Sequence, residues 1–482
     1  MNKKPNILFI MTDQLRGDSL GYAGHRDVKT PYLDTLAARG VNFDRAYSAC
    51  PSCIAARAAL MTGLAPQHNK RVGYEDNVPW DYERTLAGEL GKAGYYTICV
   101  GKMHVYPTRR YLGFDNVILH DGYLHAARYE NVPYSENQFY CDDYFHWLKK
   151  ELGADADSTA TGLDCNSWAA RSWCYDEKYH PTNWVTDNVL DFFRRRDPDQ
   201  PFFLMASYLK PHPPLDPPQY YLDRYISKEL TAPYIGTWET RDYIDKEGRI
   251  FDSKTGPVDD ELIHEMRAAY YALITHLDHQ IGRIIQALIE HNLMDNTVIV
   301  FTSDHGEELG DHYMFRKSRP YEGSCHIPML FANLKAAGIE NAEGKTISCI
   351  TELRDIMPTL LDIAGARDDS HYDGRSLLDT VKDESLSPRE YLHGEHSYGQ
   401  FSNHWIVTPH DKFIWHSETG REQYFDLSTD PHELEDLISS PQHKARTAQL
   451  RSLLIRELEG RSEGFTDGKE LIAGRPYPPV TK

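Results

Sequence analysis

Long hydrophobic runs are absent from this sequence. The first apolar run, residues 7–11, is too short for the hydrophobic region of a signal peptide, and no small-residue cleavage site follows it. No run approaches the length needed to span a membrane. We therefore predict a cytoplasmic protein that makes no use of a membrane.

Cysteine is also scarce and scattered, with eight in 482 residues. Only Cys50 and Cys53 lie close together, and no second pair with this spacing follows. This argues against a zinc or redox site of the Cys-x-x-Cys type. Because no secretion signal is seen either, we predict no disulfide bonds.

Positive charge is in deficit. The chain has 52 Lys and Arg against 72 Asp and Glu, which gives a formal net charge of −20. Such a chain is repelled by a polyphosphate backbone, so we expect no nucleic-acid partner. An anionic substrate would have to be attracted by a local cluster of Arg, Lys, His or a metal ion.

The order of apolar segments predicts an α/β fold. Strands are expected at residues 6–11, 96–100, 202–208, 297–302 and 327–331, and helices near 30–40, 82–90, 260–294 and 352–364. Alternation of this kind indicates a large, mainly parallel sheet sandwiched by helices. Residues 119–183 lack clean periodicity and are expected to form long loops that shape a substrate mouth.

The pattern changes near residue 388 to short strands with turns, followed by a charged helix near residues 440–459. This predicts a small C-terminal α+β domain with an antiparallel sheet. At 482 residues the chain is long for one core, so we expect two domains, at residues 1–385 and 386–482.

Cys53 precedes Arg57 by four residues at the point where a small-residue loop becomes a helix. A thiol at a helix N-terminus lies near free amide donors and the positive end of the helix dipole, and Arg57 returns to the same face one turn later. This arrangement suits an anion or a negatively charged nucleophile. A cysteine packed at a buried helix start is the alternative interpretation.

Polar side chains follow four of the expected strands: Asp13 and Gln14, Lys102 and His104, His212, and Asp304 and His305. Parallel strands present their carboxyl ends at one edge, where ligands bind. The two carboxylates, the amide oxygen of Gln14 and the imidazole of His305 could hold a divalent cation; oxygen ligands favour Ca²⁺ and the histidine favours Mn²⁺. Helix capping by Asp and a satisfied loop histidine remain the alternative.

These segments resemble the type I sulfatases of the alkaline-phosphatase superfamily. The motifs that carry the resemblance span nearly the whole chain. They are the strand at 5–14, Cys53 to Arg57 with Thr62-Gly63, Gly101-Lys102-Met103-His104, Pro211-His212-Pro213-Pro214, Ser303-Asp304-His305-Gly306 with Gly310-Asp311-His312, Lys317, and Tyr424-Phe425-Asp426-Leu427 with Asp430-Pro431.

The resemblance implies a sulfatase that hydrolyses sulfate monoesters of a saccharide or small alcohol. It implies that Cys53 is oxidised to formylglycine, whose hydrate attacks sulfur with one divalent metal bound. In the family pattern, Arg57 and Lys102 neutralise charge, His104 is the base for release of sulfate, and His212 and Lys317 face the sulfate and the leaving oxygen. Asn77 is a further candidate sulfate-oxygen donor.

Two departures from the family pattern leave alternatives open. Ala55-Ala56 replaces the usual Pro-Ser and resembles the signature read by the anaerobic radical maturase. The ligand set Asp-Gln-Asp-His resembles that of the phosphonate monoester hydrolase and phosphodiesterase branch, which is the alternative function. A non-catalytic binding protein on the same scaffold is a third reading, and it predicts an unmodified Cys53 and no metal. The oligomeric state is open.

Overall fold

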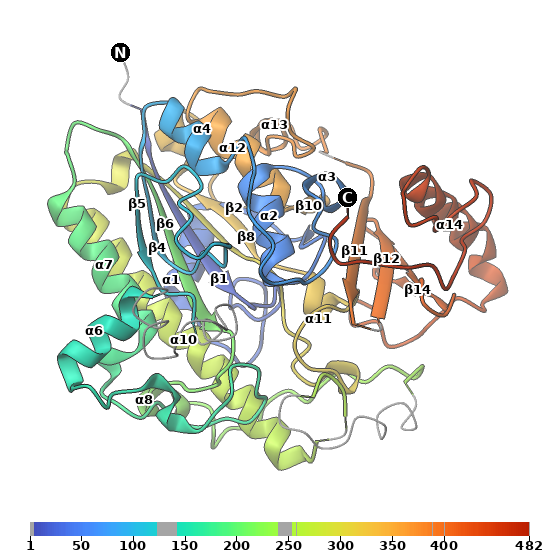
Figure 1. Ribbon diagram of the computed structural model, residues 1–482, viewed down its shortest axis with the longest axis horizontal. Helices are drawn as coiled ribbons and strands as arrows, with labels where there is room; N and C mark the ends of the chain where they lie inside the picture. The colour runs from blue at the N-terminus through green and yellow to red at the C-terminus, as the bar shows by residue number, and fades with distance from the viewer. Residues whose placement is uncertain are drawn as a thin grey trace.

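The computed structural model describes residues 4–122, 142–239, 253–256, 258–387, 389–399 and 401–481. Within these residues, an eight-stranded sheet has the order β5-β4-β6-β1-β7-β8-β2-β9 (Figure 1). Its strands are β1 (Asn6–Asp13), β2 (Gly40–Phe43), β4 (Tyr96–Gly101), β5 (Asn116–Leu119), β6 (Phe202–Pro211), β7 (Thr297–Ser303), β8 (Met329–Ala332) and β9 (Lys345–Ile347). β8 is antiparallel to both β7 and β2, whereas the other pairings are parallel. The prediction of a mainly parallel sheet is therefore confirmed.

Both faces of this sheet are buried, which explains the continuous apolar character of its strands. In β1, Ile7 and Phe9 belong to one core cluster, and Leu8 and Ile10 belong to the cluster on the opposite face. The first cluster includes residues of α2 (Cys53–Thr62), α4 (Leu86–Lys92) and α12 (Ile356–Ile363). The second includes residues of α1 (Pro31–Ala38), α7 (Pro181–Arg195) and α10 (Asp260–Glu290).

A second sheet follows near the C-terminal end of the chain and lies to the right in Figure 1. It consists of β11 (Leu392–Tyr398), β12 (Phe401–Val407), β13 (Asp411–His416) and β14 (Glu422–Asp426), all antiparallel to their neighbours. One face packs Phe413 and Trp415 against α14 (Lys444–Leu458), while Trp405 and Ile414 on the other face pack with Tyr47. The predicted smaller α+β unit is present; its boundary at residue 385 stays a prediction.

The expectation of long loops over residues 119–183 is wrong where α6 (Asp143–Leu152) forms. The Asp142 side chain caps this helix by accepting a hydrogen bond from the Phe145 amide at 3.0 Å. Tyr144, Phe145 and Leu148 are buried on one face of α6. A helix this short, with aromatic residues on its apolar face, shows too little periodicity to be recognised. Residues 123–141, which include part of the predicted loop, lie outside the described residues.

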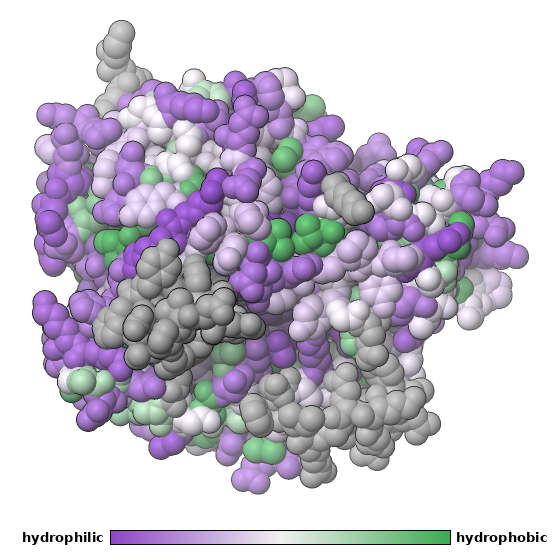
Figure 2. All heavy atoms as spheres, in the orientation of Figure 1, coloured by the Kyte–Doolittle hydropathy of each residue, from purple (hydrophilic) through white to green (hydrophobic). Residues whose placement is uncertain are grey.

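Shorter elements complete the described structure: β3 (Ala46–Tyr47), β10 (Thr351–Glu352), α3 (Pro66–Asn69), α8 (Gln219–Leu222), α11 (Glu322–Cys325) and α13 (Leu378–Lys382). The face drawn in Figure 2 is mostly hydrophilic, with small, separate hydrophobic areas. Among the described residues, no helix combines the length and the apolar character needed to cross a bilayer.

Candidate active site

Two aspartates meet at the carboxyl edge of the main sheet. Asp13 is the last residue of β1, and Asp304 directly follows β7. These strands are parallel neighbours with Thr12 opposite Ser303, so their next residues emerge side by side. The backbone amide of Gln14 donates a hydrogen bond to Asp304 Oδ1 at 3.1 Å and fixes that carboxylate. The pairing of β1 with β7 therefore places the carboxylates of Asp13 and Asp304 side by side.

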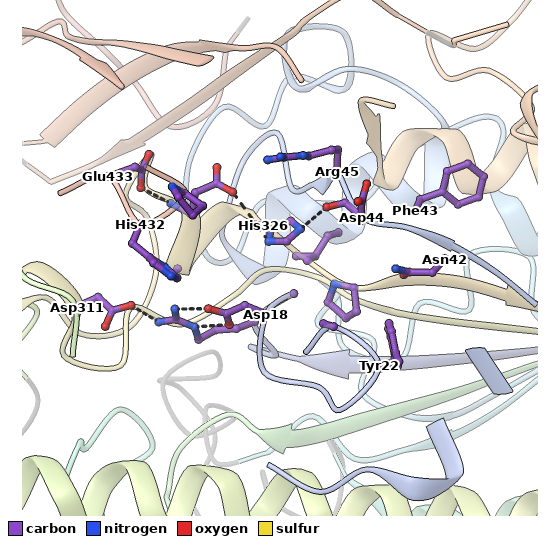
Figure 3. A pocket seen from close by; sticks show the side chains of 18 of the residues that line it. Asp18, Tyr22, Asn42, Phe43, Asp44, Arg45, Asp311, His326, His432 and Glu433 are labelled. Carbon is purple, nitrogen blue, oxygen red and sulfur yellow. Dashed lines mark hydrogen bonds and ion pairs between the residues drawn. The ribbon is translucent and has the colours of Figure 1, made fainter. Parts of the chain in front are cut away.

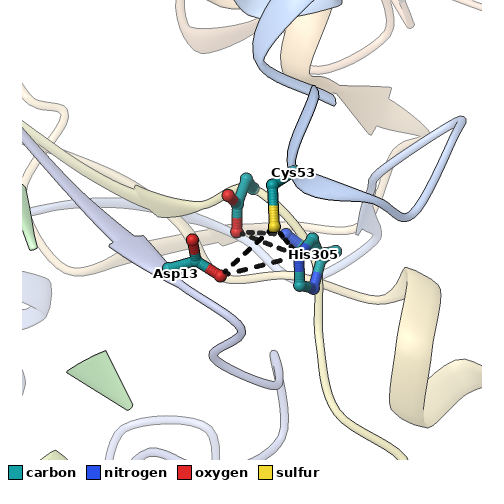
Figure 4. Close-up of side chains that lie close together, drawn as sticks. Asp13, Cys53 and His305 are labelled. Atoms are coloured by element: carbon teal, nitrogen blue, oxygen red, sulfur yellow. Dashed lines mark hydrogen bonds and ion pairs between the residues drawn. The ribbon is translucent and has the colours of Figure 1, made fainter. Parts of the chain in front are cut away.

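Cys53 is the first residue of α2 and faces this pair (Figure 4). Its Sγ lies 3.7 Å from Asp13 Oδ1 and 3.2 Å from His305 Nε2. His305 Nδ1 lies 2.9 Å from the Gly306 carbonyl, to which it can donate, and this leaves Nε2 as the acceptor that faces the thiol. One atom each from Asp13, Cys53, Asp304 and His305 lie within 4.8 Å of one another, and all four residues are buried.

Two buried cations surround this group. Lys102 bonds to Asp13, and its Nζ lies 3.9 Å from Cys53 Sγ. Arg57 Nε donates to Asp304 Oδ2 at 3.0 Å, and its Nη1 donates to the Lys102 carbonyl at 2.8 Å. Because Arg57 is one helical turn after Cys53, α2 delivers the thiol and the guanidinium together. The acidic pair is thus held by a matched pair of basic side chains.

These charges alter the ionisation of the thiol and the carboxylate. Burial alone would raise the pKa of Asp13, but Lys102 and neighbouring cations hold it well below its usual value. Burial and Asp13 also push the pKa of the Cys53 thiol upward, yet Lys102, Lys317 and His305 outweigh them and lower it. Position 53 therefore favours a negatively charged atom.

His212 and Lys317 form the opposite wall. The His212 amide donates to the Asp13 carbonyl at 3.1 Å, which fixes the loop after β6 against β1. His212 Nδ1 lies 2.7 Å from the Pro213 carbonyl, so Nε2 is free to accept a hydrogen bond from Lys317 Nζ at 2.9 Å. Burial, then Lys317, lowers the pKa of His212 well below its usual value, so the ring is neutral. Lys317 also donates to Gln14 Oε1 at 2.6 Å.

A cavity of about 120 Å³ opens onto Cys53, with His212 and Lys317 in its wall. His104 is buried, its amide donates to Asp121 at 2.8 Å, and its ring packs edgewise on Tyr74, which lines the cavity. His104 Nε2 also lies 3.8 Å from Asp76, a neighbour that the sequence analysis did not select. Asn77 is exposed, and it is not part of the described cavity wall. The structure therefore brings the predicted residues together apart from two: His104 is linked to the cavity through Tyr74, and Asn77 lies outside the described wall.

A second cavity of about 330 Å³ lies elsewhere and does not include Cys53 (Figure 3). Its wall mixes acids and bases such as Asp18, Asp311, Arg45 and Glu433. Arg16 joins Asp18 and Asp311 there, each at 2.7 Å. The paired charges of this wall leave no single sign to attract a ligand, in contrast to the cavity above Cys53.

The donor set fits a divalent cation. Asp13 and Asp304 supply carboxylate oxygens, and the side-chain oxygen of Gln14, which accepts a hydrogen bond from Lys317, is the third candidate oxygen donor. His305 contributes Nε2, oriented by its own second nitrogen. Three oxygen donors and one imidazole match hard divalent ions with some tolerance for nitrogen.

A family model described as "Sulfatase" matches residues 5–366. The chain belongs to the sulfatase family. A second model, described as "N-sulphoglucosamine sulphohydrolase, C-terminal", matches residues 310–459 of the sulfatase.

The sulfatase is 49% identical to an arylsulfatase of Clostridium perfringens over 98% of both chains. It is 29% identical to a choline-sulfatase of Rhizobium meliloti, with 93% of this chain and 85% of the relative covered. A phosphonate monoester hydrolase of Agrobacterium radiobacter superimposes with a TM-score of 0.76 at 26% identity, over 94% of this chain and 95% of the other. The chain is therefore a sulfuric ester hydrolase on an alkaline-phosphatase-like fold, as the motifs implied.

Four charged or aromatic residues in the cavity wall of the sulfatase were missed from the sequence: Tyr74, Lys254, Arg316 and Tyr398. Arg316 precedes the selected Lys317, and this adjacency was the one available signal. The other three lie in segments with no recognisable motif.

Proposed function

We propose that this sulfatase hydrolyses sulfate monoesters of a saccharide or small alcohol, with residue 53 converted from cysteine to formylglycine and one divalent cation bound. The hydrated formylglycine supplies a nucleophilic hydroxyl and a second hydroxyl whose deprotonation releases sulfate. The cation, Ca²⁺ or Mn²⁺, would be held by Asp13, Gln14, Asp304 and His305 and supplies positive charge beside that hydroxyl.

One observation carries this proposal: Cys53 Sγ lies among Asp13, Asp304 and His305 at the floor of a cavity. Lys102 and Arg57 neutralise the carboxylates around this thiol. The lowered pKa of the Cys53 thiol reflects surroundings that also favour an oxyanion at this position.

The remaining side chains have separable roles. Lys102 and Arg57 neutralise Asp13 and Asp304 and keep both carboxylates in place. Lys317 is the candidate donor of a proton to the leaving oxygen, because its ammonium reaches into the cavity and bonds to neutral partners, Gln14 and His212. His104, buried beside Tyr74, is the proposed base for sulfate release, and Asn77 stays a predicted sulfate-oxygen donor.

Mass spectrometry combined with turnover tests the nucleophile. The peptide that contains residue 53 should show the mass loss of thiol-to-aldehyde conversion after co-expression with a radical maturase, the type that Ala55-Ala56 favours. The same preparation should release sulfate from 4-nitrophenyl sulfate, and the fraction converted should scale with kcat. Full activity in protein with only unmodified cysteine would overturn the assignment.

Phosphonate monoester or phosphodiester hydrolysis is the second candidate. Gln14 and His305 in the proposed ligand set favour it, and so does the likeness to the phosphonate monoester hydrolase. Sulfate monoesters and phosphodiesters each carry one negative charge, so one cavity can accept both. Measuring kcat/KM for 4-nitrophenyl sulfate, bis(4-nitrophenyl) phosphate and 4-nitrophenyl phenylphosphonate on one preparation ranks the candidates.

A further inference from the structure

Several basic side chains line the cavity above Cys53 in an otherwise acidic protein. Lys254, Arg316 and Lys317 line it together with His212, and none of the described lining residues is Asp or Glu. The whole chain carries a net charge of −20, so the described part of this wall differs in charge from the chain as a whole. A sulfate monoester brings one negative charge, which Lys317 at the inner end can meet. Lys254 and Arg316 place two further basic side chains on the same wall.

Backbone pairing holds these two extra cations beside each other. Thr255 and Met314 form an antiparallel bridge, and the Phe315 amide donates to the Lys254 carbonyl at 2.9 Å. The same pairing continues with the Gly256 amide on the Tyr313 carbonyl at 3.0 Å. Lys254 and Arg316 therefore come from adjacent, hydrogen-bonded segments, and both side chains reach the cavity.

Two tyrosines complete the outer part of this wall. The backbone of Gly73 pairs with Ser397, and a Cβ at Gly73 would lie 1.9 Å from the Ser397 carbonyl oxygen. This close approach brings Tyr74 and Tyr398 together, with ring centroids 5.9 Å apart at 80°. Lys254 Nζ lies 3.4 Å from the centroid of the Tyr398 ring, which holds the ammonium at the cavity rather than in solvent.

We infer that this sulfatase selects substrates with a second anionic group, a carboxylate or a second sulfate, which Lys254 and Arg316 bind while Cys53 faces the scissile sulfate. The Tyr74 and Tyr398 rings contact the body of the substrate between the two anions. This inference rests on the proposed function and adds the substrate class to it.

Matched aryl sulfates test the inference. The substrates are 3- and 4-carboxyphenyl sulfate, each compared with its uncharged carbamoylphenyl analogue. The expected result is a kcat/KM about tenfold or more higher for at least one carboxylate, the size of one well-placed charge contact. Raising the salt concentration should reduce this ratio, because ions screen a contact at a cavity mouth.

Substitutions assign the preference to residues. Lys254→Gln and Arg316→Gln should each lower the ratio, and the double variant should bring it to about one. Lys228→Gln is the matched control, because Lys228 Nζ lies 5.2 Å from the Tyr225 ring centroid but outside the cavity wall. A melting temperature for each variant excludes misfolding as the cause. A ratio near one in the wild-type protein, or an undiminished ratio in the double variant, overturns the inference.

A binding measurement separates this inference from the proposed function. In the Cys53→Ala protein, calorimetry should find tighter binding of a carboxyphenyl sulfate than of its carbamoyl analogue. If none of the esters is hydrolysed by the modified enzyme but this difference in Kd persists, the proposed function fails and the second-anion site stands. Equal Kd values for both ligands refute the site whatever the turnover.

Discussion

Two buried cysteines of this sulfatase sit beside a buried lysine and two acids, yet their surroundings act in opposite directions. Cys53 has Lys102 and Asp13 as neighbours, and its pKa is lowered. Cys325 has Lys412 at 3.6 Å, but burial and nearby carboxylates raise its pKa well above the usual value. The residue types near the thiol are therefore insufficient to explain its ionisation.

Position in the helix and the balance of charge make the difference. Cys53 is the first residue of α2, and Lys317 and His305 also face it and lower its pKa. Cys325 is the last residue of α11, and its Sγ donates to the Tyr321 carbonyl at 3.1 Å, which keeps the proton on sulfur. A helix start and excess positive charge favour an anion, whereas a helix end and a carbonyl acceptor favour the neutral thiol.

The largest contrast is expected on removal of each thiol. Cys53→Ala should lower kcat on 4-nitrophenyl sulfate by on the order of 10⁴-fold or more, because the nucleophile is lost. Cys325→Ala should keep most activity and lose stability through a small buried cavity. Steady-state kinetics and thermal melts of both variants measure this. Near-normal turnover in the Cys53 variant would contradict the proposed role of residue 53 as the nucleophile.

Removal of the divalent cation should affect the group around Cys53 and not the group around Cys325, which we call the Cys53 cluster and the Cys325 cluster. Asp13, Cys53, Asp304 and His305 form the one His/Cys/Asp/Glu group of this kind within the described residues. Dialysis against a chelator should lower kcat by on the order of 10³-fold, with recovery on adding Ca²⁺ or Mn²⁺. Elemental analysis should find about one ion per chain in active protein. An active preparation without metal would refute this role.

Replacing Lys412 and Lys102 by methionine, one at a time, should show that Lys412 acts mainly on stability and Lys102 mainly on activity. Lys412→Met leaves Glu322 and Glu433 buried without their ammonium partner, which should cost about 3–5 kcal/mol in the free energy of unfolding. Lys102→Met should lower kcat by on the order of 10²-fold with a smaller loss of stability, since the proposed cation would also neutralise Asp13. Denaturant unfolding and kinetics on both proteins test this. Equal stability losses would show that the two clusters do not differ as described.

A smaller effect is expected from pH at the Cys325 cluster. Burial raises the pKa of Glu433 to about 7, against the attraction of Lys412. The folded protein therefore holds a proton that the unfolded chain releases near pH 4.5, so stability should fall as pH rises from about 4.5 to 7. The slope is at most about 1.4 kcal/mol per pH unit. Glu433→Gln should flatten it, as measured by urea unfolding at several pH values; an unchanged slope would assign the effect to another group.

The sequence was informative where local pattern and strand order decide the structure. Asp13 and Asp304 could be placed together because each lies at the carboxyl end of a strand of a parallel sheet, and Cys53 could be placed with them through the family resemblance. Lys254 and Tyr398 could not be placed, since they reach the cavity through the Thr255–Met314 and Gly73–Ser397 bridges, which join segments distant in sequence. Such long-range backbone contacts have no local signature.

The bridge between Gly73 and Ser397 has an evolutionary consequence. It is one of several backbone contacts that attach the C-terminal sheet to the rim of the cavity, and it leaves no room for a side chain at Gly73. A lineage could therefore diversify what enters by altering β11 and its neighbours, while the strand ends that break the ester bond stay the same. Tyr398 of β11 and the strand ends that carry Asp13 and Asp304 lie on separate stretches of one polypeptide.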